Sequence, residues 1–119
     1  MLYIEDLKRA YSLKRSVKKT EETISELKKH DKNLICSMEC EMLEYKVSIL
    51  NGSLAEIVDF INDCEDALIS QAMYYRYLCG KTWGQTAQSL GAYNSSDCIR
   101  KMVERYLEKK GVTKRVGEA

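Results

Sequence analysis

The feature that most constrains the fold is an apolar seam that recurs every three or four residues through the middle of the chain. Ten positions alternate by four and three without a slip: Cys36, Cys40, Leu43, Val47, Leu50, Leu54, Ile57, Ile61, Cys64 and Leu68. This spacing places all ten along one face of an α-helix. Because the 119 residues include no proline, the backbone keeps every amide donor that a long helix needs.

The segment Asn51-Gly52-Ser53 is where this helix could break. Glycine costs about 1 kcal/mol in a helix interior, and serine is a good N-cap residue. The seam nevertheless keeps its phase across the segment, which favours one helix over residues 34–79, with a kink at Gly52 as a variant. Two helices, the second capped by Ser53, are the alternative.

A second seam, near the N-terminus, predicts a partner helix over residues 3–29. Its eight positions have the same spacing, and six of them are apolar or aromatic: Tyr3, Asp6, Ala10, Leu13, Val17, Thr20, Ile24 and Leu27. The two segments also complement each other in charge. Residues 1–33 hold nine Lys/Arg against six Asp/Glu (+3), and residues 34–79 hold two against eight (−6).

Two seamed helices joined by the turn at residues 30–33 predict an antiparallel hairpin, a coiled-coil-like stem. The side chains expected to be buried between the helices are Leu13, Val17, Ile24, Leu27, Val47, Leu50, Leu54 and Ile57. Further apolar residues lie off the seam and could form a second contact: Met38, Met42, Tyr45, Ile49, Val58 and Ile69. A homo-oligomer, with a dimer favoured, is therefore expected.

The C-terminal third has the layout of a helix-turn-helix. Gly80 ends the preceding helix, Thr82 caps a short helix over 83–90, and residues 91–94 form a turn. Ser95 or Ser96 caps a last helix that runs to about residue 110. The expected fold is all-α, with a hairpin stem (1–73), a helix-turn-helix module (74–110) and a flexible tail (111–119).

The residues 76–91, RYLCGKTWGQTAQSLG, resemble the signature RY-x-x-G-x-(T/S)-W-x-x-x-A-x-x-L-G of the fourth region of bacterial sigma factors. The whole layout is similar to small phage proteins, such as late-gene transcriptional regulators of phages of Gram-positive bacteria. Two features depart from the family: Thr86 stands where isoleucine is usual, and Asp97 and Glu104 place acid on the last helix. The resemblance implies sequence-specific binding of duplex DNA in the cytoplasm of a bacterial host, with a stem that holds dimer contacts or binds RNA polymerase.

The expected DNA contacts lie on the two helices of the module, in a region (80–119) whose eight Lys/Arg and four Asp/Glu balance at +4. Phosphates would be bound by Lys81, Arg105, Lys109 and the backbone N–H groups at the start of the last helix. Bases would be read by Ser96, Arg100 and Lys101, supported by Gln85 and Gln88. Ser95 and Asp97 complete the candidate set at the helix start.

Other functional classes find little support in the sequence. No catalytic set or phosphate loop is present, so an enzyme is not expected, nor is a cofactor. Five cysteines and the single His30 favour reduced thiols over a zinc site or disulfides. No apolar run approaches the ~20 residues of a membrane span, and the charged start MLYIEDLKRAY is unlike a signal peptide. Two alternatives to a regulator remain: a DNA-packaging protein of the small-terminase kind, and a structural assembly protein that does not bind DNA.

Overall fold

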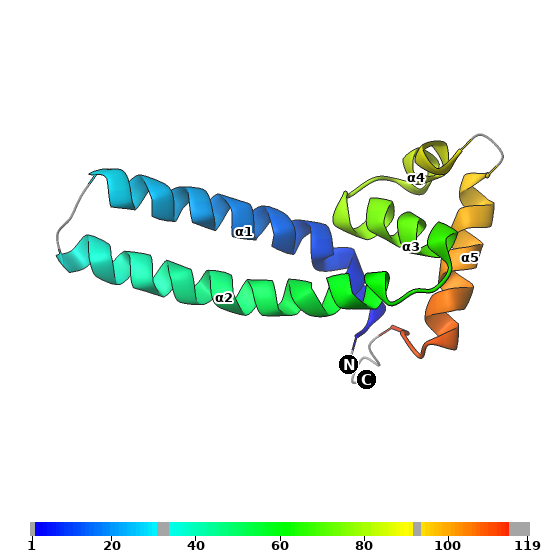
Figure 1. The fold of residues 1–119 in the computed structure, drawn as a ribbon, viewed down its shortest axis with the longest axis horizontal. Coiled ribbons are helices and arrows are strands. Elements are labelled where there is room, and N and C mark those ends of the chain that lie inside the picture. The colour runs from blue at the N-terminus through cyan, green and yellow to red at the C-terminus, as the bar shows by residue number, and fades with distance from the viewer. Residues whose placement is uncertain (1, 31–33, 92–93, 115–119) are drawn as a thin grey trace. The chain divides into compact units, whose positions relative to one another are not determined.

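The computed structural model describes residues 2–30, 34–91 and 94–114, and over these ranges it contains helices and no strand. Its long helices are α1 (Ile4–His30) and α2 (Leu34–Asn62). The shorter ones are α3 (Ala67–Met73), a π-helical turn η1 (Tyr74–Leu78), α4 (Trp83–Leu90) and α5 (Ser96–Lys109). Figure 1 shows α1 and α2 running antiparallel as a hairpin. The predicted all-α fold is thus confirmed.

The chain forms two compact units. The hairpin unit is Ser12–Ala55, and the head unit combines Met1–Tyr11 with Glu56–Ala119. Both long helices therefore contribute to both units. The head unit includes residues 56–73, which were expected to belong to the stem.

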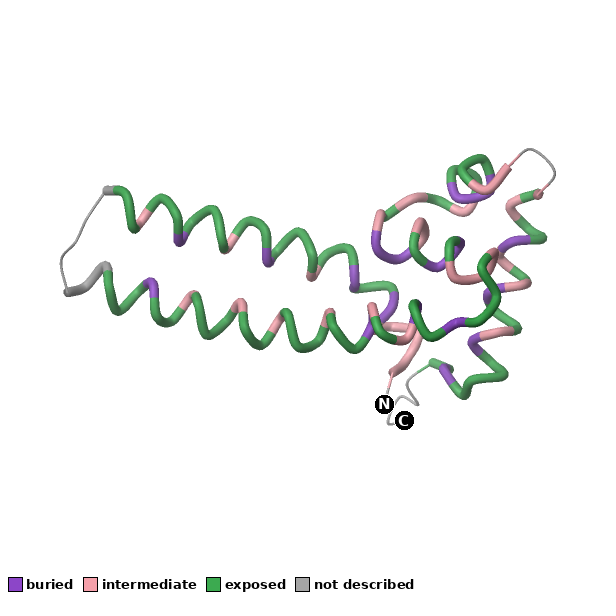
Figure 2. The backbone as a smooth tube through the Cα atoms, viewed as in Figure 1, coloured by how far each residue is buried: buried purple, intermediate pink, exposed green. Residues whose placement is uncertain are grey.

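In the hairpin unit, the burial of side chains follows the two seams closely. Between residues 12 and 29 and between 37 and 55, every side chain off the seams is exposed, and every side chain on them is buried or half-buried (Figure 2). Lys28 and Glu44 add an ion pair of 2.8 Å between the helices. Not all the expected burial is found, however. Leu13, Leu27, Val47, Leu50 and Leu54 are only half-buried, because two helices alone cannot enclose a seam.

Helix α2 continues through Asn51-Gly52-Ser53, so the prediction of one helix across this point is confirmed. The Ser53 hydroxyl donates to the Ile49 carbonyl at 3.5 Å, within the helix, and does not cap a new one. The extent of the helix was predicted wrongly, since α2 ends at Asn62 and not at residue 79.

A local cap accounts for the early end of α2. The Asp66 carboxylate accepts hydrogen bonds from the backbone N–H groups of Leu68 and Ile69 at 3.0 and 3.2 Å, which starts α3. The Ser70 hydroxyl donates to the Ile61 carbonyl at 2.9 Å and so satisfies one of the last acceptors of α2.

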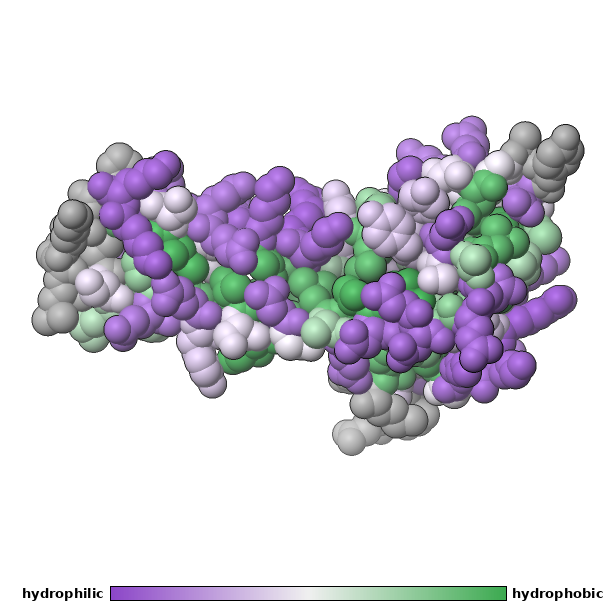
Figure 3. Space-filling model, in the orientation of Figure 1, coloured by the Kyte–Doolittle hydropathy of each residue, from purple (hydrophilic) through white to green (hydrophobic). Residues whose placement is uncertain are grey.

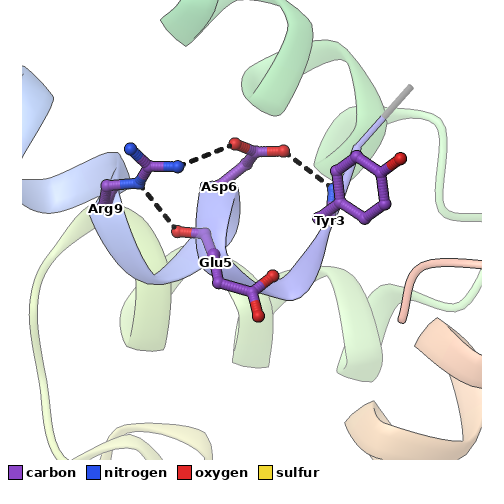
Figure 4. Close-up of polar contacts among 4 residues, drawn as sticks. All are labelled: Tyr3, Glu5, Asp6 and Arg9. Atoms are coloured by element: carbon purple, nitrogen blue, oxygen red, sulfur yellow. Dashed lines mark hydrogen bonds and ion pairs between the residues drawn. The ribbon is translucent and has the colours of Figure 1, made fainter. Parts of the chain in front are cut away.

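A similar cap fixes the start of α1 (Figure 4). Asp6 occupies a seam position, but its carboxylate caps the start of the helix. It accepts a hydrogen bond from the Tyr3 N–H at 2.8 Å and another from Arg9 Nη2 at 3.4 Å. Arg9 Nε also donates to the Glu5 carbonyl at 3.4 Å. This capping role explains why a polar residue occupies a position in the apolar seam.

The head unit has a continuous core to which all of its helices contribute. Helices α3, α4 and α5 pack against one another in every pairing. The core residues, all less than a tenth exposed, are Leu7, Ala10, Ile57, Ile61, Cys64, Ala72, Met73, Tyr77, Leu78, Thr86, Ala87, Ile99, Val103, Leu107 and Val112. None of the described helices is both long and apolar enough to cross a membrane.

The segment after α5 differs from the expected loose tail. Gly111 takes a φ of 77°, which lets the chain turn back so that the Val112 N–H donates to the Leu107 carbonyl at 2.8 Å. Val112 is buried, and the Thr113 carbonyl accepts from the Ile4 N–H at 3.0 Å. Residues 111–113 thus have defined contacts with the rest of the head unit, whereas a flexible tail was expected from residue 111. Residues 115–119 lie outside the described ranges.

Candidate nucleic-acid interface

The first helix of the candidate interface, α4, is fixed at its start by a reciprocal cap. The Gln85 N–H donates to Thr82 Oγ1 at 3.2 Å, and the Thr82 N–H donates to Gln85 Oε1 at 3.0 Å. Just before it, Gly80 takes a φ of 71°, as expected of a residue that ends a helix. The predicted roles of Thr82 and Gly80 are confirmed.

The second helix, α5, is capped by Ser95, whose Oγ accepts from the Cys98 N–H at 3.1 Å. This decides between Ser95 and Ser96, the two predicted caps. Helices α4 and α5 pack together, with Thr86 and Ala87 buried on α4 and Ile99 and Val103 buried on α5. The small Ala87 side chain permits close approach of two helices, so the module has the predicted helix-turn-helix packing.

The exposed side of α5 carries a ridge of three cations: Lys101, Arg105 and Lys109. Their spacing of four residues aligns them along one side of the helix. Lys101 lies two residues from both Ile99 and Val103, so it points away from the core. Within the described ranges none of the three forms a hydrogen bond or an ion pair.

Arg100, a predicted base-reading residue, is held by acids of its own helix. Its Nη2 lies 3.3 Å from Asp97 Oδ1, and its Nη1 lies 3.7 Å from Glu104 Oε1. All three side chains are substantially exposed. Pairs of this kind contribute only about 0–1 kcal/mol, because water screens them. Arg100 therefore differs from Lys101 in having local partners that a ligand would have to replace.

Arg105 and Lys109 also line a cavity of about 480 Å³ in the head unit. Asp63, Glu65 and Asp66, from the connection between α2 and α3, contribute to the same lining. These carboxylates lower the local positive potential that a phosphate would experience. Two of the three predicted phosphate-binding side chains thus have acidic neighbours that are distant in sequence.

The same cavity contains a tyrosine whose ionisation is suppressed. Burial raises the pKa of Tyr106 to about 12, and a hydrogen bond with the Cys64 thiol acts in the same direction. The nearby Asp63 and Glu65 carboxylates raise that pKa further. Tyr106 therefore stays neutral further into the alkaline range than a free tyrosine does.

The predicted contacts on the α4 side gather around a shallow hollow lined by Cys79, Gly80, Lys81, Gln85, Gln88 and Ser89. Lys81 Nζ donates to Ser89 Oγ at 2.8 Å and lies 4.7 Å from the centre of the Tyr75 ring. The Gln85 side chain is used in the cap of α4. Gln88 is exposed on the outer side of that helix. Ser96 is half-buried beside the α5 cap, and Asp97 is exposed.

Arg76 has a positioning role that was not predicted from the sequence. Its Nη1 donates to the Lys81 carbonyl at 2.9 Å, and its guanidinium lies 5.1 Å from the ring centre of Trp83. The contact joins η1 to the turn before α4. In the motif Arg76 lies seven residues before Trp83, and this spacing could have indicated a contact between them. Only the fold identifies the Lys81 carbonyl as the hydrogen-bond acceptor.

The described cysteines are free thiols: Cys40 and Cys64 are buried, Cys79 is half-buried and Cys98 is exposed. The Cys36 side chain lies outside the described part of the chain. No cluster of three or more His, Cys, Asp or Glu residues with metal-binding geometry occurs among the described residues.

A comparison with known proteins adds no assignment: no protein-family model matches this chain, and no curated protein or solved structure matches it either.

Proposed function

We propose that the head unit binds duplex DNA in a sequence-specific manner and that the protein is a phage-type transcriptional regulator. In this proposal α5 lies in the major groove, and α4 crosses the sugar-phosphate backbone. The observation that carries it is the exposed cationic ridge of α5, Lys101, Arg105 and Lys109, on a helix whose opposite side is buried against α4.

Lys101 is the best placed residue for base reading, because it is exposed and points directly away from the core. Arg100 can also contact a base, at a modest cost in free energy. Its exposed ion pairs contribute about 0–1 kcal/mol, whereas a bidentate contact with guanine contributes about 1–3 kcal/mol. A guanine at the right position would therefore draw Arg100 away from Asp97 and Glu104.

Phosphate binding would involve the start of α5 and the outer side of α4. The first N–H groups of α5 and its helix dipole favour an anion. Gln88 is exposed on α4, and Lys81 reaches the same surface. The acids beside Arg105 and Lys109 make these two cations weaker contributors than Lys101.

The test is a salt series of DNA binding, measured by fluorescence anisotropy of a labelled duplex with the full chain. Affinity should fall steeply between about 50 and 200 mM salt, as counterions return to the phosphates. Lys101→Glu should weaken binding at least ~10-fold, since it places a like charge beside the groove. Lys18→Glu is the matched control, because Lys18 is an exposed lysine on α1. Binding without salt dependence, or equal loss in both variants, would contradict the proposal.

One observation favours a second candidate, a helical assembly protein that does not bind DNA. Asp97 and Glu104 flank Arg100, while Asp63, Glu65 and Asp66 share a cavity with Arg105 and Lys109. If these acids prevent DNA binding, Asp97→Asn combined with Glu104→Gln should create an affinity that the natural chain lacks. If the natural chain already binds, the same double variant should only raise non-specific affinity.

A further inference from the structure

An apolar stripe runs along the outer side of α2 in the hairpin unit. Met38, Met42, Tyr45 and Ile49 are 56%, 72%, 71% and 53% exposed, and they follow one another by four, three and four residues. This spacing places them on a single helix face, separate from the seam that faces α1. The exposed residues of α1 between positions 12 and 29 are all polar or charged, so the stripe belongs to α2 alone.

The hairpin unit also has too little core to enclose its own seam. The seam residues of α2 from Leu43 to Leu54 are only half-buried, apart from the buried Cys40 before them. In Figure 3, apolar surface shows along the hairpin below the hydrophilic side chains of its upper edge. Helical hairpins gain most of their stability from packing, so a hairpin with a thin core gains from burying a further apolar surface, such as the stripe, against another helix.

We infer that this stripe pairs two copies of the chain, with the α2 helices antiparallel about a two-fold axis between Met42 and Tyr45. In that register Met38 lies opposite Ile49 of the second copy, and Met42 lies opposite Tyr45 of the second copy. A two-fold interface uses the same patch on both copies and closes at two. The inference does not depend on DNA binding.

Charge supports the second copy as the partner and the antiparallel direction. Beside the stripe, Glu39 of one copy is adjacent to Lys46 of the other, and the symmetry gives this pair twice. Glu41 is adjacent to the neutral Ser48 of the other copy. Glu44 is already paired with Lys28 of its own hairpin at 2.8 Å.

A parallel pairing is less favourable on the same grounds. It would place the acidic segment of each copy, from Glu39 to Glu44, beside its equivalent, and it would align the two helix dipoles. The antiparallel arrangement places this acidic segment beside the half of α2 that contains Lys46.

The experiment is sedimentation equilibrium of the full chain at micromolar concentrations, with circular dichroism to verify the helical content of each variant. The natural chain should sediment at twice the mass of one chain. Met42→Glu should weaken the dimer at least ~10-fold, because it places a charge at the centre of the apolar stripe. Ser25→Glu, on the exposed side of α1, is the matched control and should leave the dimer intact.

Charge exchange tests the direction. Glu39→Lys and Lys46→Glu should each weaken the dimer several-fold, and the double variant should recover most of the loss. Recovery by Glu41→Lys with Lys46→Glu instead would show a parallel pairing and overturn the proposed register. A monomer, or a dimer or ring that Met42→Glu leaves unchanged, would overturn the interface itself.

Discussion

The hairpin unit and the head unit bury their apolar side chains in different ways. In the described part of the hairpin unit only Val17, Ile24 and Cys40 are buried, and the other seam residues are half-buried. In the head unit, side chains from both ends of the chain meet in one core, and Leu7, Met73 and Val103 are completely inaccessible. Since stability follows the apolar area removed from water, the head should be the more stable part and the hairpin should depend on a partner.

A pair of matched leucine truncations tests this contrast and has the largest expected effect. Leu107→Ala in the head should cost about 2–5 kcal/mol, because it leaves a cavity in a closed core. Leu50→Ala in the hairpin should cost about half as much or less, because its side chain is only half-buried. Urea unfolding followed by Trp83 fluorescence reports on the head, and circular dichroism reports on all helices. Equal losses of stability in the two variants would contradict the difference in burial between the two units.

Replacement by alanine should change the stability of the chain in opposite directions at two of its glycines. At Gly80 an added Cβ would lie 2.7 Å from the Tyr11 ring on a backbone with φ of 71°, so Gly80→Ala should cost about 1–3 kcal/mol. At Gly52 the helix has open space around the added atom, so Gly52→Ala should stabilise the chain by about 1 kcal/mol. Thermal unfolding measures both. A stabilised Gly80→Ala would show that the Tyr11 ring can move away without cost.

An alkaline pH series tests the head core by a different route. Burial raises the pKa of Tyr77 to about 12 from its ordinary value near 10. The unfolded state therefore loses this proton first, and the stability that the neutral phenol provides falls as pH rises from 10 towards 12. The loss should reach about 2 kcal/mol, and Tyr77→Phe should remove that part of the pH dependence. Parallel curves for the two proteins would show that Tyr77 is not buried as described.

The smallest expected effect concerns Thr86. Its side chain is completely buried, and the structure gives its hydroxyl no hydrogen-bond partner among the described residues. Thr86→Val should therefore stabilise the head by about 1 kcal/mol, because it removes an unpaired polar group at constant shape. Thr23→Val is the control, since the Thr23 hydroxyl is exposed and donates to the Lys19 carbonyl at 3.1 Å. A destabilised Thr86→Val would indicate that the hydroxyl has a partner.

Local signals predicted the helices and most of their ends. The two seams, the caps at Thr82 and Ser95 and the turn at Gly80 all depend on residues within a few positions of one another. The end of α2 at Asn62 was missed because Cys64 and Leu68 keep the heptad phase through the break. Periodicity cannot detect a cap such as Asp66 when the spacing around it is unchanged.

Prediction of the candidate site from the sequence is limited to local interactions in the same way. The pairing of Arg100 with Glu104 is visible in a spacing of four residues. The acids beside Arg105 and Lys109 come from residues 63–66, about forty positions away, and only the fold brings them together. The packing of Val112 and Thr113 against the start of the chain is non-local in the same sense.

Two basic surfaces among the described residues, one on α5 and one on α1, allow the most direct test of the proposed function. Helix α1 between residues 12 and 29 holds six Lys/Arg against three Glu, so it too could attract a polyanion. The measurement is amide chemical-shift mapping of the isotope-labelled full chain, titrated with duplex DNA at moderate salt. DNA binding by the head should shift signals within residues 81–110, most strongly from Ser95 to Lys101, and leave the hairpin unchanged. Shifts along α1 with none in α5 would contradict the account.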